Sequence, residues 1–108
     1  MVGVSVAWEH GPSGRVVCAK LAADSWEINV RGARSDLTRL TQIREADWLS
    51  RRSLRAGLVA GAPVFWSFAD GQVSLLVGED DEVWDVAVSV PVEVVDELAQ
   101  AVGRLAEP

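Results

Sequence analysis

The chain has 108 residues, of which 49% are hydrophobic, and carries a formal net charge of −6. A chain of this length and composition can bury one hydrophobic core, so we expect a single domain over residues 1–108. No apolar run approaches the roughly 20 residues needed to span a bilayer, and the N-terminus does not have the pattern of a secretory signal. We therefore expect a soluble, cytoplasmic protein that does not insert into a membrane.

The charge is unevenly distributed along the chain. Seven arginines against three acidic residues between Arg31 and Arg55 give +4, and the remaining −10 completes the net charge of −6. From Asp70 to Glu97 there are nine acidic residues and no Lys or Arg. Because phosphate binding needs cations, nucleic acid is an unfavourable partner. The polarity suits head-to-tail self-association or a charged protein partner, and it is equally compatible with a solvated surface that maintains solubility.

Alternating apolar residues predict three strands in the first part of the chain. Residues 2–8 form the first, residues 15–21 return after a turn at residues 10–14, and residues 26–31 form the third. Residues 36–43 are ambiguous, because three apolar residues have helical spacing while two threonines favour a strand.

The remaining elements follow in the same way. Residues 45–54 have the composition of a short amphipathic helix, and two glycines then break the chain. Residues 63–90 predict a three-stranded meander, with turns at Asp70-Gly71 and at the acidic run 79–82. Residues 92–105 predict a helix that lies across the sheet. Its apolar stripe consists of Val94, Val95, Leu98, Ala101, Val102 and Leu105.

Two pairs of tryptophans reveal an internal repeat. Trp8 and Trp66 are 58 positions apart, and so are Trp26 and Trp84. Laying residues 3–30 over 61–88 aligns the apolar positions of both segments. We therefore predict an α+β fold in which duplicated antiparallel meanders supply about seven strands, with a short central helix and a C-terminal helix packed on the sheet.

The residues do not form a recognisable catalytic constellation. His10 lies in a turn and Cys18 in the middle of a strand, so we expect Cys18 to be a buried small hydrophobe and not a nucleophile. The run Glu79–Glu82 could hold calcium, yet it lacks the alternating ligand spacing of a calcium loop and favours a solvated hairpin tip. No phosphate-binding glycine motif occurs. We expect no enzymatic activity, no cofactor and no bound metal.

The five tryptophans divide into two groups. Four of them are in phase with the apolar positions of strands, which favours core packing over a ligand cage or a base-stacking platform. Trp48 instead lies in a segment rich in arginine, which is the composition of a protein-interaction hot spot. Alternatively, Trp48 and Leu49 dock the predicted short helix on the sheet, and one residue pair can do both.

An order of four strands, a short helix, three strands and a C-terminal helix resembles the SsgA-like sporulation and cell-division proteins, which have a whirly-like fold. Asp24-Ser25-Trp26-Glu27-Ile28 is similar to that family's Asp-Pro-Tyr-Ala-Val, and Ala46-Asp47-Trp48-Leu49 resembles its Arg-Asp-Leu-Leu. Gly61-Ala62-Pro63-Val64-Phe65-Trp66 resembles its Gly-Asp-Val-x-Val-Trp. The resemblance covers about residues 16–101. The Pro and Tyr of the first motif, the Arg of the second and the Asp of the third are missing.

The resemblance implies a non-enzymatic adaptor that binds division proteins as a small homo-oligomer. Partner binding would then use two surfaces, a basic face and an opposite, acidic pole. The basic face would consist of Trp48, Leu49, Arg51, Arg52 and Arg55, and the acidic pole of Glu79, Asp80, Asp81 and Glu82.

Two other functions stay open. Small size, acidity and a strand-rich domain are also ordinary in immunity proteins, whose acidic hairpin can mimic the phosphates that a nuclease toxin binds. Single-stranded nucleic-acid binding would need a continuous, aromatic basic face between Arg31 and Arg55.

Overall fold

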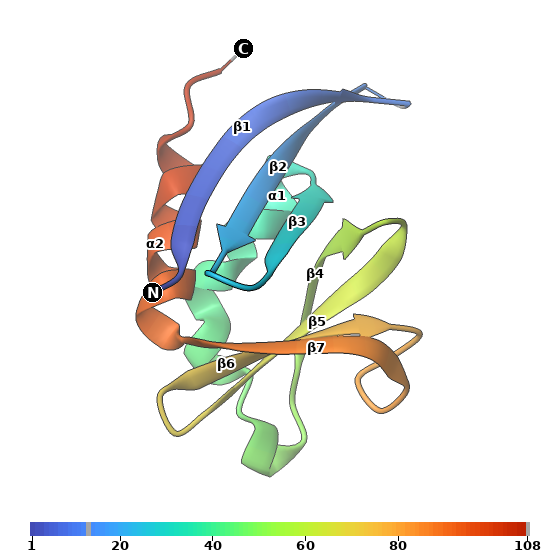
Figure 1. Cartoon of the computed structure of the whole chain (residues 1–108), viewed down its shortest axis with the longest axis vertical. Helices are drawn as coiled ribbons and strands as arrows, with labels where there is room; N and C mark the ends of the chain where they lie inside the picture. The colour runs from blue at the N-terminus through green and yellow to red at the C-terminus, as the bar shows by residue number, and fades with distance from the viewer. Residues whose placement is uncertain (13, 108) are drawn as a thin grey trace.

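The computed structural model describes residues 1–12 and 14–107, and it shows one antiparallel sheet with helical segments packed on it (Figure 1). The seven strands lie in the sheet in chain order. The predicted α+β fold is therefore confirmed. The radius of gyration is 12.9 Å, close to the roughly 13 Å of a compact domain of about 100 residues. Residue 13 of the turn predicted at 10–14 and residue 108 of the predicted domain lie outside the described residues.

The elements alternate between groups of strands and helical segments. None of the helices in the described residues is long and apolar enough to cross a membrane. The chain runs through β1 (Gly3–Gly11), β2 (Gly14–Ala22), β3 (Glu27–Gly32), α1 (Arg34–Leu37), the 3-10 helices η1 (Thr38–Glu45) and η2 (Trp48–Ser50), β4 (Leu54–Val59), β5 (Ala62–Ala69), β6 (Gln72–Gly78), β7 (Trp84–Pro91) and α2 (Val92–Arg104).

The two segments of the predicted repeat occupy β1–β3 and β5–β7. Val6 faces Ala19 in the first hairpin and Val64 faces Val77 in the second, so both hairpins have the same register after a shift of 58 residues. α1 and α2 each follow the third strand of a copy. β4 is the additional strand that joins the copies in one continuous sheet.

The predicted order of four strands before the central helix is wrong, because three strands precede the helical segments and four follow them. The ambiguous residues 36–43 are helical, and Leu37, Leu40 and Ile43 are fully buried. Thr38 and Thr41 fit this segment because their hydroxyls donate to backbone carbonyls three residues earlier, at 3.2 and 3.0 Å.

The helix predicted over residues 45–54 is also wrong. The 3-10 helix η1 ends at Glu45, and η2 has only three residues. Arg51 follows in the left-handed conformation, with φ of 57°, which stops the helix. Leu54 already belongs to β4 and pairs with Trp66, so the second half of the predicted helix is partly a loop and partly a strand.

The hydrophobic core lies between one face of the sheet and α2 with η1. α2 packs against η1 and β1, and it follows directly on β7 (Figure 1). Of the predicted apolar stripe of α2, Val95, Leu98 and Val102 are buried. The other three members are half-buried, and Val92 and Ala99 are buried in addition. We call the opposite side of the sheet the outer face.

Candidate functional site

A pocket of about 200 Å³ opens on the outer face of β5, β6 and β7. The three strands supply a row of hydroxyls, because Ser67 pairs with Ser74 and Ser74 pairs with Ser89 across the strands. The hydroxyls of Ser74 and Ser89 lie 3.3 Å apart. The pocket therefore has a partly polar floor and two aromatic walls. Its lining consists of Trp48, Ser67, Ala69, Gln72, Ser74, Leu76 and Trp84.

Trp84 reaches this pocket because of a break in the register of β7. Val86 pairs with Val77, whereas Trp84 pairs with Gly78, so one residue is added to β7 between them. The extra residue turns Trp84 to the outer face, on which Leu76 lies. Gly78 permits this close pairing, since a Cβ there would overlap Trp84 Cα and lie 2.8 Å from the carbonyl oxygen of Val83.

The core position predicted for Trp84 is therefore wrong. Its exposed fraction is 46%. Trp66 is fully buried as predicted, and its indole N–H donates to the carbonyl of Ala56 at 2.9 Å. Trp8 and Trp26 are half-buried and pack against the core. The alternation of apolar residues could not show that the added residue changes the face on which Trp84 lies.

Each tryptophan of the pocket has an exposed apolar neighbour in the chain. Leu49, beside Trp48, is 82% exposed, and Val83, beside Trp84, is 57% exposed. Exposed apolar clusters of this kind are common at protein-protein contacts. We call Trp48, Leu49, Val83 and Trp84 the tryptophan surface.

Local hydrogen bonds hold the η2 part of this surface in place. The Asp47 carboxylate accepts from the backbone N–H of Leu49 at 3.0 Å and from the Ser50 hydroxyl at 3.2 Å. The backbone N–H of Phe68, in β5, donates to the carbonyl of Ala46. The guanidinium of Arg51 lies 5.3 Å from the centre of the Trp48 ring, a cation–π contact. Trp48 is therefore positioned by η2, β5 and Arg51 together.

The acidic turn adjoins the η2 segment. The Asp80 carboxylate accepts from the backbone N–H groups of Glu82 and Val83, at 2.8 and 2.7 Å, which shapes the turn. The Ser53 hydroxyl donates to Asp81 at 2.7 Å and ties this turn to the residues after η2. The predicted placement of 79–82 at an opposite pole from Trp48 is therefore wrong.

The predicted basic face does not form one surface either. Arg51 stacks on Trp48, whereas Arg52 borders a separate hollow with Gln42 and Glu45. Arg55 borders a third hollow with Asp36 and Arg39.

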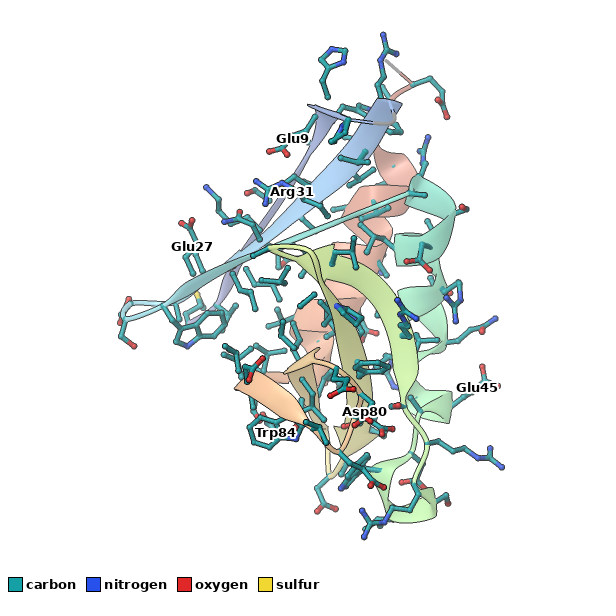
Figure 2. All side chains as sticks on the ribbon, turned by 90° about the vertical axis from the view of Figure 1, so that its right-hand side faces the viewer. Glu9, Glu27, Arg31, Glu45, Asp80 and Trp84 are labelled. Atoms are coloured by element: carbon teal, nitrogen blue, oxygen red, sulfur yellow. The ribbon has the colours of Figure 1, made fainter. Side chains whose placement is uncertain are left out.

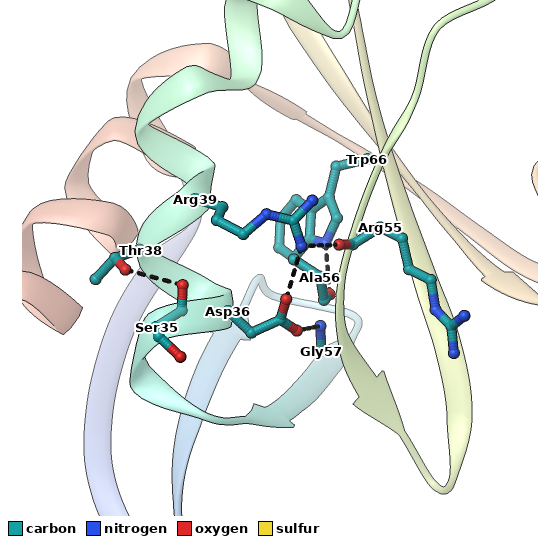
Figure 3. A network of polar contacts seen from close by, with 8 residues as sticks. All are labelled: Ser35, Asp36, Thr38, Arg39, Arg55, Ala56, Gly57 and Trp66. Atoms are coloured by element: carbon teal, nitrogen blue, oxygen red, sulfur yellow. Dashed lines mark hydrogen bonds and ion pairs between the residues drawn. The ribbon is translucent and has the colours of Figure 1, made fainter.

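The surroundings of Arg55 form a structural network, shown in Figure 3. Arg39 donates to Asp36 at 2.8 Å and to the backbone carbonyl of Arg55 at 2.9 Å. The other oxygen of Asp36 accepts from the backbone N–H of Gly57 at 2.8 Å. The side chain of Arg55 points away from these contacts (Figure 3). The network fixes α1 and η1 against β4.

Among the described residues, ion pairs engage four of the seven arginines in the +4 segment. Arg31 donates to Glu9 at 2.7 Å, and Arg44 makes two hydrogen bonds to Asp96 at 2.7 and 2.8 Å. Arg34 pairs with Glu107 and Arg39 with Asp36. The pKa of Asp96 is lowered by its hydrogen bonds to Arg44, and the pKa of Glu9 by those to Arg31. Three of these four ion pairs, those of Arg31, Arg34 and Arg44, therefore join segments that are far apart in the sequence.

The side chains considered above as a nucleophile or as metal ligands do not form a reactive site. Burial raises the pKa of the Cys18 thiol, which keeps it protonated and poorly nucleophilic at neutral pH. Its neighbours on the outer face of β1–β3 are polar, among them Glu9 and Arg31, which Figure 2 labels on this part of the sheet. Within residues 1–12 and 14–107, no group of three His, Cys, Asp or Glu side chains is arranged to hold a metal ion.

In comparisons with known proteins, no family model, no curated protein and no solved structure matches this chain.

Proposed function

We propose that this protein is a non-enzymatic binding module that holds a partner protein on the tryptophan surface. The observation that supports this most is the exposure of large apolar side chains beside the pocket walled by Trp48 and Trp84. Tryptophan and arginine are the residues most enriched among those that dominate binding energy in protein interfaces. Arg51 lies on the Trp48 ring, so both residue types are present at this site.

The size of the pocket favours a protein partner over a small molecule. Its volume is about 200 Å³, below the roughly 300–1,000 Å³ of most ligand pockets. A hollow of this size suits a single side chain of a partner. The surrounding charges of Arg51, Glu79, Asp80 and Glu82, all on exposed residues, would then form the polar rim that such interfaces have.

The two specific roles expected from the sequence both need such a surface. An adaptor for cell-division proteins, the role implied by the SsgA-like resemblance, would bind a division component there. An immunity protein would bind its toxin. We propose the division adaptor first, because the SsgA-like resemblance implies it, and the immunity protein as the alternative, each with a cytoplasmic location. The two roles would use the same surface and differ in the partner.

Site-specific photocrosslinking in the source organism tests the proposal. A photoreactive amino acid replaces Leu49, which is 82% exposed on the tryptophan surface, or Leu58, an exposed leucine of β4 that borders a different hollow. We expect discrete protein adducts from position 49 and not from position 58, and a loss of these adducts when Trp84→Ser is added. Mass spectrometry then identifies a division protein or a toxin.

Equal adducts at both positions, or adducts that Trp84→Ser leaves unchanged, would refute the tryptophan surface as the binding site. Crosslinks to nucleic acid alone would refute a protein partner. Circular dichroism of the Trp84→Ser variant is the control for folding, because this exposed side chain is not required by the core.

A further inference from the structure

β7 is an edge strand that projects beyond the core. It is last in the sheet order, and β6 is its only partner strand within residues 1–12 and 14–107. Residues 84–87 and Ser89 are exposed, although alternate residues of a strand on a closed core are normally buried. Among the described residues, no backbone hydrogen bond outside the sheet involves residues 84–90. Every second backbone N–H and C=O of β7 is therefore free to pair with another strand.

The composition of β7 does not protect this edge. Proteins usually guard an exposed edge with lysine, proline or a strand too short to pair. β7 has eight residues, its proline is the last of them, and Asp85 is its only charged residue. Val86, Val88 and Val90 favour an extended conformation. The bulge between Trp84 and Val86 interrupts the pairing only at the start of β7, and the strand is regular from Val86 onward.

The pocket lies beside this edge. Its wall Trp84 belongs to β7, and its floor belongs to β6 and β5. A strand added to β7 would direct alternate side chains to the outer face, next to Trp84 and Ala87. A large apolar side chain on such a strand would have a hollow of about 200 Å³ to occupy.

The charges near the edge of β7 favour a basic partner segment over a second copy of this chain. Residues 70–97 contain nine acidic residues and no Lys or Arg, and Arg51 and Arg52 are the basic residues of the adjoining η2 segment. A second copy that paired β7 with β7 would bring two such acidic segments together, which costs free energy. A basic segment would find complementary charge in Glu79, Asp80, Glu82 and Asp85, all exposed.

We propose that β7 and its pocket bind an extended, basic segment of a partner protein by strand addition, with one large apolar side chain of that segment held between Trp48 and Trp84. This inference rests on the proposed function and adds the binding mode and the chemistry of the partner. Main-chain hydrogen bonds to the edge supply affinity in this mode, and pockets for alternate side chains supply selectivity.

Selection of peptides on the full chain tests the charge and the side chains that we propose for the partner segment. A random library of 12-residue peptides displayed on phage is selected on the immobilised protein, and the Trp84→Ser variant is used to remove peptides that bind elsewhere. We expect enrichment of peptides with a net positive charge, β-branched residues and a conserved aromatic or Leu position. Enrichment of anionic peptides, or of none, would overturn the inference.

The best peptide then tests the backbone pairing. Two versions are synthesised with N-methyl groups on its odd or on its even residues. Because only alternate N–H groups of an added strand face β7, we expect one version to lose binding in fluorescence anisotropy and the other to retain it. Equal effects in both versions would overturn strand addition.

Two alanines provide a matched pair of variants. Ala87 is exposed on β7 and Ala7 is exposed on β1, the other edge strand. Ala87→Lys should weaken the peptide by about tenfold or more, because it places a like charge and a long side chain in the binding path, whereas Ala7→Lys should change it by less than about twofold. Similar effects from both would refute β7 as the site.

The outcomes separate this inference from the proposed function. If position 49 captures a partner while no basic peptide binds, the protein is a binding module and the mode proposed for β7 is wrong. If sedimentation shows a dimer that Ala87→Lys dissociates and Ala7→Lys does not, the occupant of the edge is a second copy and the basic partner is refuted.

Discussion

Equivalent tryptophans of the repeat have different environments. Trp66 is fully buried, whereas its counterpart Trp8 is half-buried and donates its indole N–H to the carbonyl of Ala106 at 2.7 Å. Trp84 is 46% exposed, whereas its counterpart Trp26 packs against the core. The neighbours in the fold decide what each indole does, since the local sequence around each pair is alike.

Replacing Trp66 by Phe should destabilise the protein by about 2–3 kcal/mol, because the change leaves a cavity and removes the hydrogen-bond partner of the Ala56 carbonyl. Urea unfolding measures the difference in free energy. Trp84→Phe is the matched control and should stay within about 0.5 kcal/mol, as expected for an exposed position. Similar losses in both variants would mean that Trp84 contributes to the core.

Among the elements, β4 depends on a single glycine. Gly57 has φ of +78°, and a Cβ there would overlap Val30 Cγ1 and lie 3.1 Å from Leu37 Cδ2. β4 therefore approaches β3 and α1 more closely than any side chain would allow. Its register with β5 is irregular between Arg55 and Leu58, which removes the alternation that identifies a strand in sequence.

Gly57→Ala should cost about 2–4 kcal/mol, since the positive φ disfavours a side chain and the close neighbours must move. Gly61→Ala is the matched control. Gly61 has φ of +85° and open space around it, so this variant should show only the backbone part, about 1–2 kcal/mol. Thermal or urea unfolding of both variants gives the comparison, and equal losses would show that the close packing of β4 adds nothing.

For the molecule as a whole, ion pairs between distant segments hold the helices together. Arg44 of η1 and Asp96 of α2 are 52 residues apart and make two hydrogen bonds. The side chains are 52% and 33% exposed, so solvent screens the pair and its contribution to stability should be small.

The contribution of this pair should depend on pH in a defined direction. Arg44 lowers the pKa of Asp96 in the folded state, so the pair stabilises the fold above the unfolded pKa of about 3.9. This stabilisation is lost as the pH falls through the folded pKa. The difference in unfolding free energy between wild type and Asp96→Asn should therefore be full at pH 6 and vanish in strong acid. Glu97→Gln, at an exposed residue of the same helix, is the control, and a difference that persists in acid would exclude an ionic origin.

The sequence predicted the class of fold from its alternation and its repeat. Residues 3–30 and 61–88 carry the same apolar pattern, and they form β1–β3 and β5–β7 with the same hairpin register. The stripe of α2 was also visible, because helical periodicity is a local property. For the candidate site, the composition around Trp48 and the acidic turn at 79–82 were visible as well.

Only the tertiary structure decided how these parts meet. The bulge before Val86 turns Trp84 outward, and the Ser53–Asp81 hydrogen bond joins the acidic turn to the η2 segment. Arginines that are close together in the sequence form ion pairs with distant residues on different elements, as Arg31 does with Glu9 and Arg44 with Asp96. The sequence by itself determined where the strands of both repeats and the helix α2 form, because the apolar periodicity that specifies them depends only on neighbours in the chain. Which residues meet at the tryptophan surface depends on contacts between segments far apart in the sequence, so only the tertiary structure determined it.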